Sequence, residues 1–270
     1  MTSAADWSLA ADPSRRIGHA VEFHAEIGST NDRARAALRE SSRDGLAVVA
    51  DLQTEGRGRR GRTWLSPPGA NLLVSVGLRP ELEPRLAGLL GIAAALAVRE
   101  GCVEVAPDAG LAIRWPNDVV DRDGRKVAGL LVETVLEGGA LVEAVIGMGI
   151  NANWLPAEMP PELAGAATSL AALSGSEVDR VALLGRLLDA LDAEVSGLER
   201  GETPLARLRS CAWLDGRRVE VDTGDGVVAG RVAGVADDGS LLLDADAGRL
   251  ALSIGEVVRV HDLSPAGVSR

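Results

Sequence analysis

The sequence contains no tyrosine and one phenylalanine, and with five tryptophans its aromatic fraction is only 2%. Proteins that read single-stranded RNA usually stack bases on aromatic side chains, so this scarcity argues against that class. Lysine is almost missing as well: of 28 basic residues one is Lys126, which leaves 27 arginines. The 39 acidic residues give a formal net charge of −11, whereas a general nucleic-acid binder usually carries a basic excess.

Cysteines and long apolar runs are also scarce. Cys102 and Cys211 match no metal-site spacing and allow at most one disulfide, so a reducing compartment is expected. The longest apolar run, residues 88–98, is shorter than a membrane span, and no signal peptide is visible. We therefore expect a cytoplasmic protein without a membrane partner. Its 270 residues suffice for one large or two modest domains.

Hydrophobic periodicity changes twice along the chain. Residues 1–20 are small and polar and are expected to form a flexible arm, too short for a winged-helix or helix-turn-helix module, so no DNA partner is expected. Over residues 21–212, strand-like and helix-like periods alternate. The expected strands are 46–52, 71–78, 111–115, 126–136 and 140–150, and the expected helices are 31–40, 85–100 and 179–198.

Two details refine this pattern. Apolar residues alternate over 71–78, which predicts a strand that is buried on one face only. Gly138-Gly139 predicts a hairpin turn between the last two strands. From residue 213 to 270 the pattern differs, because five short β-rich segments are separated by Gly and Asp turns, which predicts a small barrel. The expected fold class is α+β, with a mixed β-sheet backed by helices followed by this barrel.

A loop over residues 53–69 combines four glycines with four arginines. In an acidic protein this suggests a mobile lid for an anionic ligand, since guanidinium groups match phosphate and carboxylate. The alternative is a solvated, RNA-contacting arginine loop. It is not a Walker loop, which requires a lysine. Trp64 in this loop is a candidate for stacking on a base, although packing is the commoner role of a tryptophan.

Three further segments carry candidate chemistry. In RWPND, Pro116 ends a strand and leaves Asn117 and Asp118 at its exit, either as ligand groups or as an ordinary turn. In GMGINAN, Gly147, Gly149 and Asn151 share one strand face, so either a flat ligand or another element can approach the backbone closely.

The single lysine is the third candidate. Where arginine fills every other basic position, Lys126 suggests a site that needs a compact ammonium group. Strict alternation places Lys126 and Gly129 on opposite faces of a strand. Both line one site only if a bulge intervenes or Lys126 projects from the start of the strand.

Taken in order, these segments resemble the biotin protein ligase family: STN at 29–31, GRGRRGRTW at 56–64, RWPND at 114–118, KVAGLLVE at 126–133 and GMGIN at 147–151. The resemblance runs from about residue 20 to the C-terminus. It implies a class II aminoacyl-tRNA-synthetase-like catalytic domain with a seven-stranded mixed sheet over 21–212, and an SH3-like domain over 213–270. It also implies the ligase-only type, without the DNA-binding domain of some members. Dimers occur in this family, so a homodimer is compatible with it.

The resemblance implies an enzyme that joins biotin and ATP into biotinyl-5′-AMP and transfers biotin to the biotin carboxyl carrier domain of carboxylases, with Mg²⁺ as cofactor. The positions implied to bind biotin are Ser29, Thr30, Asn31, Gln53, Gly56, Arg57, Gly58, Arg59, Lys126, Gly129, Gly147 and Gly149. Those implied to bind ATP are Arg59, Arg62, Trp64, Asn117, Lys126 and Asn151. The implied catalytic residues are Lys126, Arg59 and Asp118, and no protein metal ligands are assigned.

The implied chemistry fits the charges. Biotin carboxylate and ATP repel each other, and Lys126, the loop arginines and Mg²⁺ can neutralise that repulsion. A glycine-hinged lid would keep water from the labile intermediate, and Asp118 is a candidate for orienting or deprotonating the acceptor lysine. Arg114 stands where family members often have lysine. The alternatives are a lipoate ligase or octanoyltransferase of related fold, a non-catalytic biotin sensor, and an RNA-binding protein.

Overall fold

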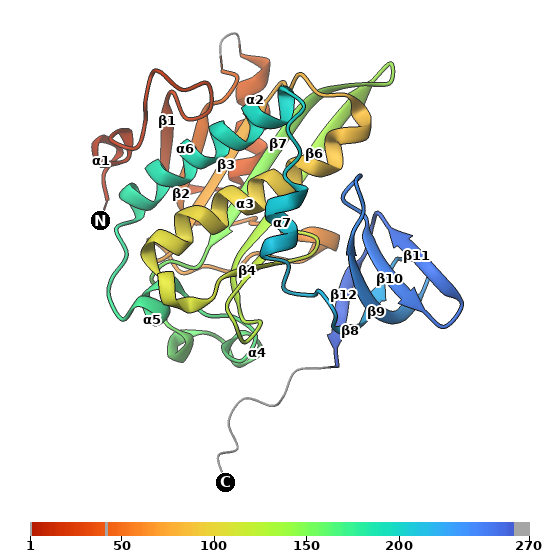
Figure 1. Ribbon diagram of the computed structural model, residues 1–270. Coiled ribbons are helices and arrows are strands. Elements are labelled where there is room, and N and C mark those ends of the chain that lie inside the picture. The colour runs from red at the N-terminus through yellow and green to blue at the C-terminus, as the bar shows by residue number, and fades with distance from the viewer. Residues whose placement is uncertain (1, 41–42, 262–270) are drawn as a thin grey trace.

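The computed structural model describes residues 2–40 and 43–261, and two separate sheets organise them (Figure 1). The larger sheet has seven strands in the order β1-β2-β3-β7-β6-β5-β4. Its first two strands pair in parallel and the other neighbours pair antiparallel, so it is the mixed sheet that the sequence predicts. The strands are β1 (Val21–Ile27), β2 (Ala47–Gln53), β3 (Leu72–Leu78), β4 (Ala112–Arg114), β5 (Asp118–Val120), β6 (Lys126–Glu137) and β7 (Ala140–Ile150).

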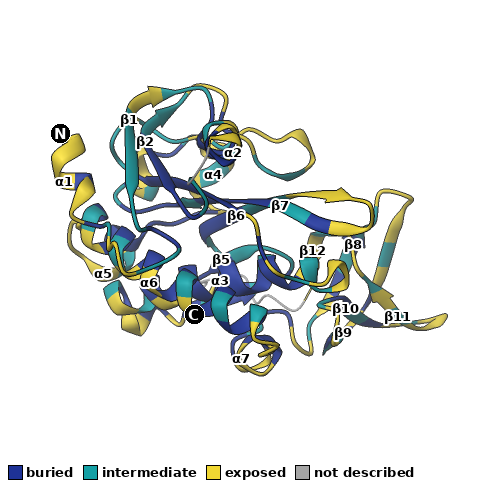
Figure 2. Ribbon diagram, turned by 90° about the horizontal axis from the view of Figure 1, so that it is seen from above, coloured by how far each residue is buried: buried dark blue, intermediate teal, exposed yellow. Residues whose placement is uncertain are grey.

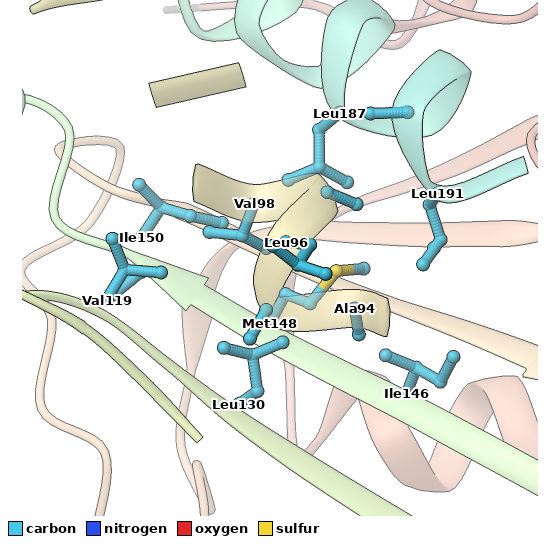
Figure 3. Close-up of a cluster of buried hydrophobic side chains, with 14 of the residues drawn as sticks. Ala94, Leu96, Val98, Val119, Leu130, Ile146, Met148, Ile150, Leu187 and Leu191 are labelled. Carbon is cyan, nitrogen blue, oxygen red and sulfur yellow. The ribbon is translucent and has the colours of Figure 1, made fainter. Parts of the chain in front are cut away.

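Two long helices cover one face of this sheet, and a shorter one covers the other (Figure 2). Side chains of α3 (Ala87–Val105) and α6 (Arg180–Glu199) pack with apolar residues of β6 and β7, as Figure 3 shows. On the opposite face, α2 (Thr30–Arg39) packs on Val48 and Val145. The short helices are α1 (Ala4–Ser8), α4 (Pro161–Ala164), α5 (Leu170–Ser174) and α7 (Leu205–Ser210).

The apolar helix α3 belongs to the core. Together with the preceding turn it spans Pro84–Val105, which is long and apolar enough to cross a membrane by length and composition. Most of this segment, 61% of its most apolar window, is buried inside the fold. Leu90, Ala94, Ala97 and Val98 are fully buried, so the segment is a core helix.

Strand β3 corrects the expectation of a half-buried strand. All seven of its residues are buried. It lies third in the sheet, with α3 and α6 on one face and α2 with the candidate site on the other, so its two sets of alternating side chains are both covered. The predicted hairpin between β6 and β7 is present, and Gly138 and Gly139 adopt φ of 57° and 83° there, which favours glycine.

Residues 2–20 do not form the free arm that the sequence suggests. Ser3 caps α1, and Trp7 and Ile17 belong to the main hydrophobic core with 0% and 1% exposure. Trp7 stacks on Phe23 with ring centroids 6.1 Å apart, and the Arg180 guanidinium lies 5.3 Å from the Trp7 ring centroid. The polar composition of the segment gave no sign of this packing, because two isolated apolar residues such as Trp7 and Ile17 make no periodic pattern.

Replacing Trp7 with alanine is therefore expected to destabilise the whole protein by about 3 kcal/mol, since it empties a buried site. Urea denaturation followed by circular dichroism measures this. The matched control is Leu9→Ala, because Leu9 is 78% exposed and its loss should change the free energy of unfolding by less than about 0.5 kcal/mol. Equal stability of the two variants would show that the N-terminal segment does not contribute to the fold.

The C-terminal unit is a five-stranded antiparallel sheet in the order β11-β10-β9-β8-β12. Its core joins Trp213, Val219 and Leu243 to Trp115 and Val120 of the larger unit, so the two units share one hydrophobic cluster. Figure 1 shows it packed beside the main sheet. Its strands are β8 (Arg218–Asp222), β9 (Val227–Val235), β10 (Leu241–Ala245), β11 (Gly248–Leu252) and β12 (Glu256–Val260).

Candidate active site

A cavity of about 560 Å³ opens on the α2 face of the main sheet. It is bounded by the start of α2, the glycine–arginine loop, strands β3, β6 and β7, and the β12 edge of the C-terminal unit. Nearly all of the residues that the sequence singled out line it. They are Ser29, Thr30, Asn31, Gln53, Arg57, Gly58, Arg59, Arg62, Trp64, Asn117, Asp118, Lys126, Gly129, Gly147, Gly149 and Asn151.

Gly56 is the exception, because it lies outside the cavity lining. Its carbonyl accepts the backbone N–H of Trp64 at 2.9 Å, which brings the two legs of the loop together. A Cβ at Gly56 would lie 2.9 Å from the Trp64 carbonyl oxygen. The glycine is thus needed for the close approach of two backbone segments, and its position indicates a loop-closing role in place of the expected ligand contact.

The polar end of the cavity is built from the first turn of α2 and the end of β2. The backbone N–H and the hydroxyl of Thr30 lie 2.8 and 3.0 Å from Gln53 Oε1. Asn31 donates from Nδ2 to Glu133 at 2.7 Å and accepts at Oδ1 from the Ser75 hydroxyl at 2.6 Å. Ser29, Thr30 and Asn31 are all buried, and all three line the cavity.

The glycines of β6 and β7 lie next to each other. Gly129 pairs with Gly149 across the two strands. The backbone there is covered by the protein's own side chains: a Cβ at Gly149 would lie 2.5 Å from the Trp64 ring, and one at Gly147 only 2.1 Å from Asn31 Oδ1. The glycines therefore make room for Trp64 and Asn31, which agrees with the close approach of another element that the sequence left open as one alternative, while contact with a flat ligand stays a prediction.

A β-bulge determines on which face of β6 the side chain of Lys126 lies. Between β5 and β6 the register passes from Val119↔Ala128 to Val120↔Lys126, so one residue of β6 is unpaired. Lys126 consequently reaches the same face as Gly129, where an added Cβ would lie 2.5 Å from its Nζ. The ammonium group also lies 5.3 Å from the Trp64 ring centroid. Both conditions that the sequence left open are met, since Lys126 is also the first residue of its strand.

Asp118 holds this ammonium group. RWPND forms a tight hairpin, so Asp118 begins β5 directly opposite Arg114. Its two carboxylate oxygens lie 2.7 Å from Lys126 Nζ and 2.7 Å from an Arg114 nitrogen. Burial alone would raise the pKa of Asp118, but the Lys126 and Arg114 cations outweigh it and hold the pKa below its ordinary value. Asp118 is thus a poor proton acceptor at neutral pH, which disfavours deprotonation of the acceptor lysine as its role.

The arginines of the loop have different partners. Arg57 forms two hydrogen bonds of 2.6 and 2.7 Å with Asp32 in the first turn of α2. Arg60 pairs with Asp222 and Arg62 with Glu256, each at 2.6 Å, so the loop is tied to the C-terminal unit.

Arg59 differs from these three. Its guanidinium donates to the Gly255 carbonyl at 3.2 Å and to Asn117 Oδ1 at 3.4 Å, and the described residues give it no carboxylate within ion-pair distance. Burial lowers the pKa of Arg59, although Asp118 and Glu256 act in the opposite direction. It remains a half-buried cation at the cavity wall, free to meet an anion.

Asn117 and Asn151 bind the backbone. Asn117 Nδ2 donates to the Leu130 carbonyl, and Asn151 Nδ2 donates to the Lys126 carbonyl at 3.2 Å. Both side chains therefore hold β6 in place beneath the cavity. Whether they also contact a nucleotide stays a prediction.

Sequence reasoning missed several residues at this site. Ser75 lines the cavity although it is fully buried, and its signal was one hydroxyl in an otherwise apolar strand. Arg114 was noted only as a departure from the family pattern, yet it shares Asp118 with Lys126. Glu256 and Val257 come from a different unit, and no local pattern in the sequence brings them to the cavity.

The described residues do not build a protein-only metal site. They contain no group of three or more His, Cys, Asp or Glu residues placed to hold an ion. Two of the carboxylates at the cavity, Asp118 and Glu256, are already engaged by Lys126 and Arg62. Mg²⁺ commonly uses one or two carboxylates with substrate phosphates, and these two carboxylates are not free for that.

Comparison with known proteins relates this chain to a protein family. A 36% identical relative, biotin–[acetyl-CoA-carboxylase] ligase of Mycobacterium tuberculosis, aligns over 89% of this chain and 89% of its own length. The chain belongs to the biotin protein ligase family. The biotin/lipoate A/B protein ligase family model matches residues 25–151, and the biotin protein ligase C-terminal domain model matches residues 216–260.

Other relatives agree. The bifunctional ligase/repressor BirA of Bacillus subtilis is 33% identical over 86% of this chain and 71% of its own length. Among solved structures, biotin protein ligase from Aquifex aeolicus in complex with biotin and ATP has a TM-score of 0.75 at 30% identity, over 87% of this chain and 96% of that one. The family membership and the α+β fold with its C-terminal unit, expected from the motifs, are thereby confirmed.

Proposed function

We propose that this protein is a biotin–protein ligase that forms biotinyl-5′-AMP and pyrophosphate from biotin and ATP, and then transfers biotin to a lysine of a biotin carboxyl carrier domain. The name of the Mycobacterium tuberculosis relative and the biotin- and ATP-bound Aquifex aeolicus structure support this proposal. The observation that carries it is the pair of cations at one cavity: Lys126 held on Asp118, and Arg59, to which the described residues give no carboxylate partner.

The first half-reaction needs two anions to meet. The biotin carboxylate oxygen attacks the α-phosphorus of ATP, the bond to pyrophosphate breaks, and pyrophosphate leaves with the bonding electrons. Lys126 and Arg59 lower the repulsion on approach and stabilise the charge that develops on the phosphate oxygens. Mg²⁺ bound to the ATP phosphates would supply further neutralising charge, and Asp118 and Glu256, which are engaged by Lys126 and Arg62, would not hold it.

The second half-reaction uses the same site. The amine of the carrier lysine attacks the acyl carbon of biotinyl-5′-AMP, the mixed-anhydride bond breaks, AMP leaves, and the amine loses a proton. We assign Asp118 the role of holding Lys126 over Gly129, since its lowered pKa makes it a weak base. The glycine–arginine loop covers the intermediate and excludes water while the carrier domain docks.

The two cysteines support a proposal for the location. Cys102 and Cys211 are both free and buried, and burial raises the pKa of Cys102 to about 12, so neither thiol is set up for disulfide exchange. We infer a cytoplasmic enzyme, because unpaired cysteines suit a reducing compartment.

Biotin-dependent exchange between ATP and labelled pyrophosphate tests the proposal, with lipoate and octanoate as the competing acids. We expect exchange with biotin and label on a single lysine of a carrier domain on a streptavidin blot. Exchange or transfer with lipoate or octanoate in the absence of any with biotin would overturn it. Biotin binding without exchange would instead identify a sensor.

A further inference from the structure

A buried serine lies behind the polar end of the cavity. Ser75 is on β3 and is 0% exposed, and its neighbours in sequence, Val74 and Val76, belong to the apolar core. Its hydroxyl lies 2.6 Å from Asn31 Oδ1 and 2.7 Å from Thr30 Oγ1. The serine therefore touches two of the residues that form the polar end.

Glu133 lies at the other side of Asn31. It is on β6, on the same face as Gly129, and its Oε2 accepts from Asn31 Nδ2 at 2.7 Å. Arg35 lies 3.0 Å from the same oxygen and forms an ion pair with it. A carboxylate accepts but does not donate, so this contact fixes which end of the Asn31 amide carries the nitrogen.

These contacts determine which groups of Thr30, Asn31 and Ser75 donate hydrogen bonds and which accept them. With Nδ2 on Glu133, Asn31 Oδ1 accepts the only proton of the Ser75 hydroxyl. The Thr30 hydroxyl then donates to Ser75 Oγ or to Gln53 Oε1, which lie 2.7 and 3.0 Å away. In either case the Thr30 proton points into the protein, and the lone pairs of Thr30 Oγ1 are available as acceptors.

We propose that Ser75 and Glu133 are positioning residues that set this polarity, so that the end of the cavity presents acceptors to a ring bearing N–H groups. This rests on the proposed function, since biotin carries such a ring in its cyclic urea. The dithiolane ring of lipoate has no N–H group and would leave the buried acceptors without partners. A site built to hydrogen-bond its substrate discriminates strongly against an analogue that lacks the donors.

The cluster has little freedom to adopt another arrangement. A Cβ at Gly147 would lie only 2.1 Å from Asn31 Oδ1, so the Asn31 amide packs directly against the backbone of β7. The side chains of Thr30, Asn31 and Ser75 are all buried. Loss of one fixed donor or acceptor therefore leaves its partner unsatisfied, and water cannot readily replace it.

Kinetics of Ser75→Ala and Glu133→Gln test the proposal. We expect the KM for biotin to rise about 10- to 100-fold in each variant, while the KM for ATP and kcat at saturating biotin stay within about threefold. We also expect the ratio of kcat/KM for biotin over lipoate to fall. Calorimetric titration with biotin alone should show the same loss of affinity without any turnover.

Two variants separate positioning from structure. Val74→Ala removes a buried group from the opposite face of the same strand, so it should lower stability but leave the KM for biotin unchanged. Glu137→Gln removes an exposed carboxyl from the strand of Glu133 and should change neither. A KM for biotin in Ser75→Ala and Glu133→Gln no higher than in these controls would overturn the proposal. A wild-type protein that uses lipoate but not biotin would instead overturn the function itself.

Discussion

Replacing Lys126 with arginine is expected to slow biotinyl-5′-AMP formation about 10²- to 10³-fold, even though the positive charge is kept. The ammonium group lies against a part of β6 that has no side chain, because a Cβ at Gly129 would be 2.5 Å from Nζ. The Trp64 ring also borders this space, with its centroid 5.3 Å from Nζ and its edge 2.9 Å from the same Cβ position. A guanidinium group is wider and planar, so it can keep the Asp118 ion pair only by leaving this position.

Pyrophosphate exchange measures the loss, and circular dichroism checks that the variant is folded. The matched control is Arg122→Lys, which makes the reverse exchange at an exposed position outside the cavity lining and should leave exchange unchanged. Exchange by Lys126→Arg within about threefold of wild type would refute the argument that a compact charge is required.

The rarity of lysine pointed to a residue that lines the cavity, and its functional role stays a prediction, while its geometry needed the structure. Composition indicated that Lys126 is special, but alternation placed it opposite Gly129. The register shift that reconciles the two lies between β5 and β6, and β5 is three residues long. A strand of that length carries no readable period, so the sequence could name a bulge as one possibility but could not show that it occurs.

The other omissions have similar causes. Ser75 was read as part of an apolar strand, because a single hydroxyl does not change a hydrophobic pattern. Glu256 reaches the cavity because the C-terminal unit packs on the larger unit, in a hydrophobic cluster that includes Trp115 and Trp213, about 100 positions apart in the sequence. Motifs located the loop, the lysine and the glycines because those residues are close in sequence, whereas contacts between distant segments leave no local signal.

Replacing Arg59 with glycine is expected to speed the escape or hydrolysis of enzyme-bound biotinyl-5′-AMP about 10- to 100-fold. Arg57, Arg60 and Arg62 are engaged by Asp32, Asp222 and Glu256, and these ion pairs hold the loop in place. Among residues 2–40 and 43–261, the hydrogen-bond partners of Arg59 are the Gly255 carbonyl and Asn117 Oδ1, and Arg59 is half-buried. An anionic intermediate would supply the charge partner that the described residues do not give it, and the lid would close on that contact.

Isolation of the enzyme–intermediate complex, followed by timed release of radiolabelled biotinyl-5′-AMP, measures the effect. Arg60→Gly is the matched control. Arg60 adopts φ of 56°, a region that glycine enters freely, and its ion pair with Asp222 is exposed to solvent. Removing an exposed ion pair changes little, so the control should retain the intermediate within about threefold of wild type. Equal release from Arg59→Gly and Arg60→Gly would contradict a specific phosphate contact by Arg59. That result would indicate instead that the ion pairs between the loop and the C-terminal unit keep the lid closed.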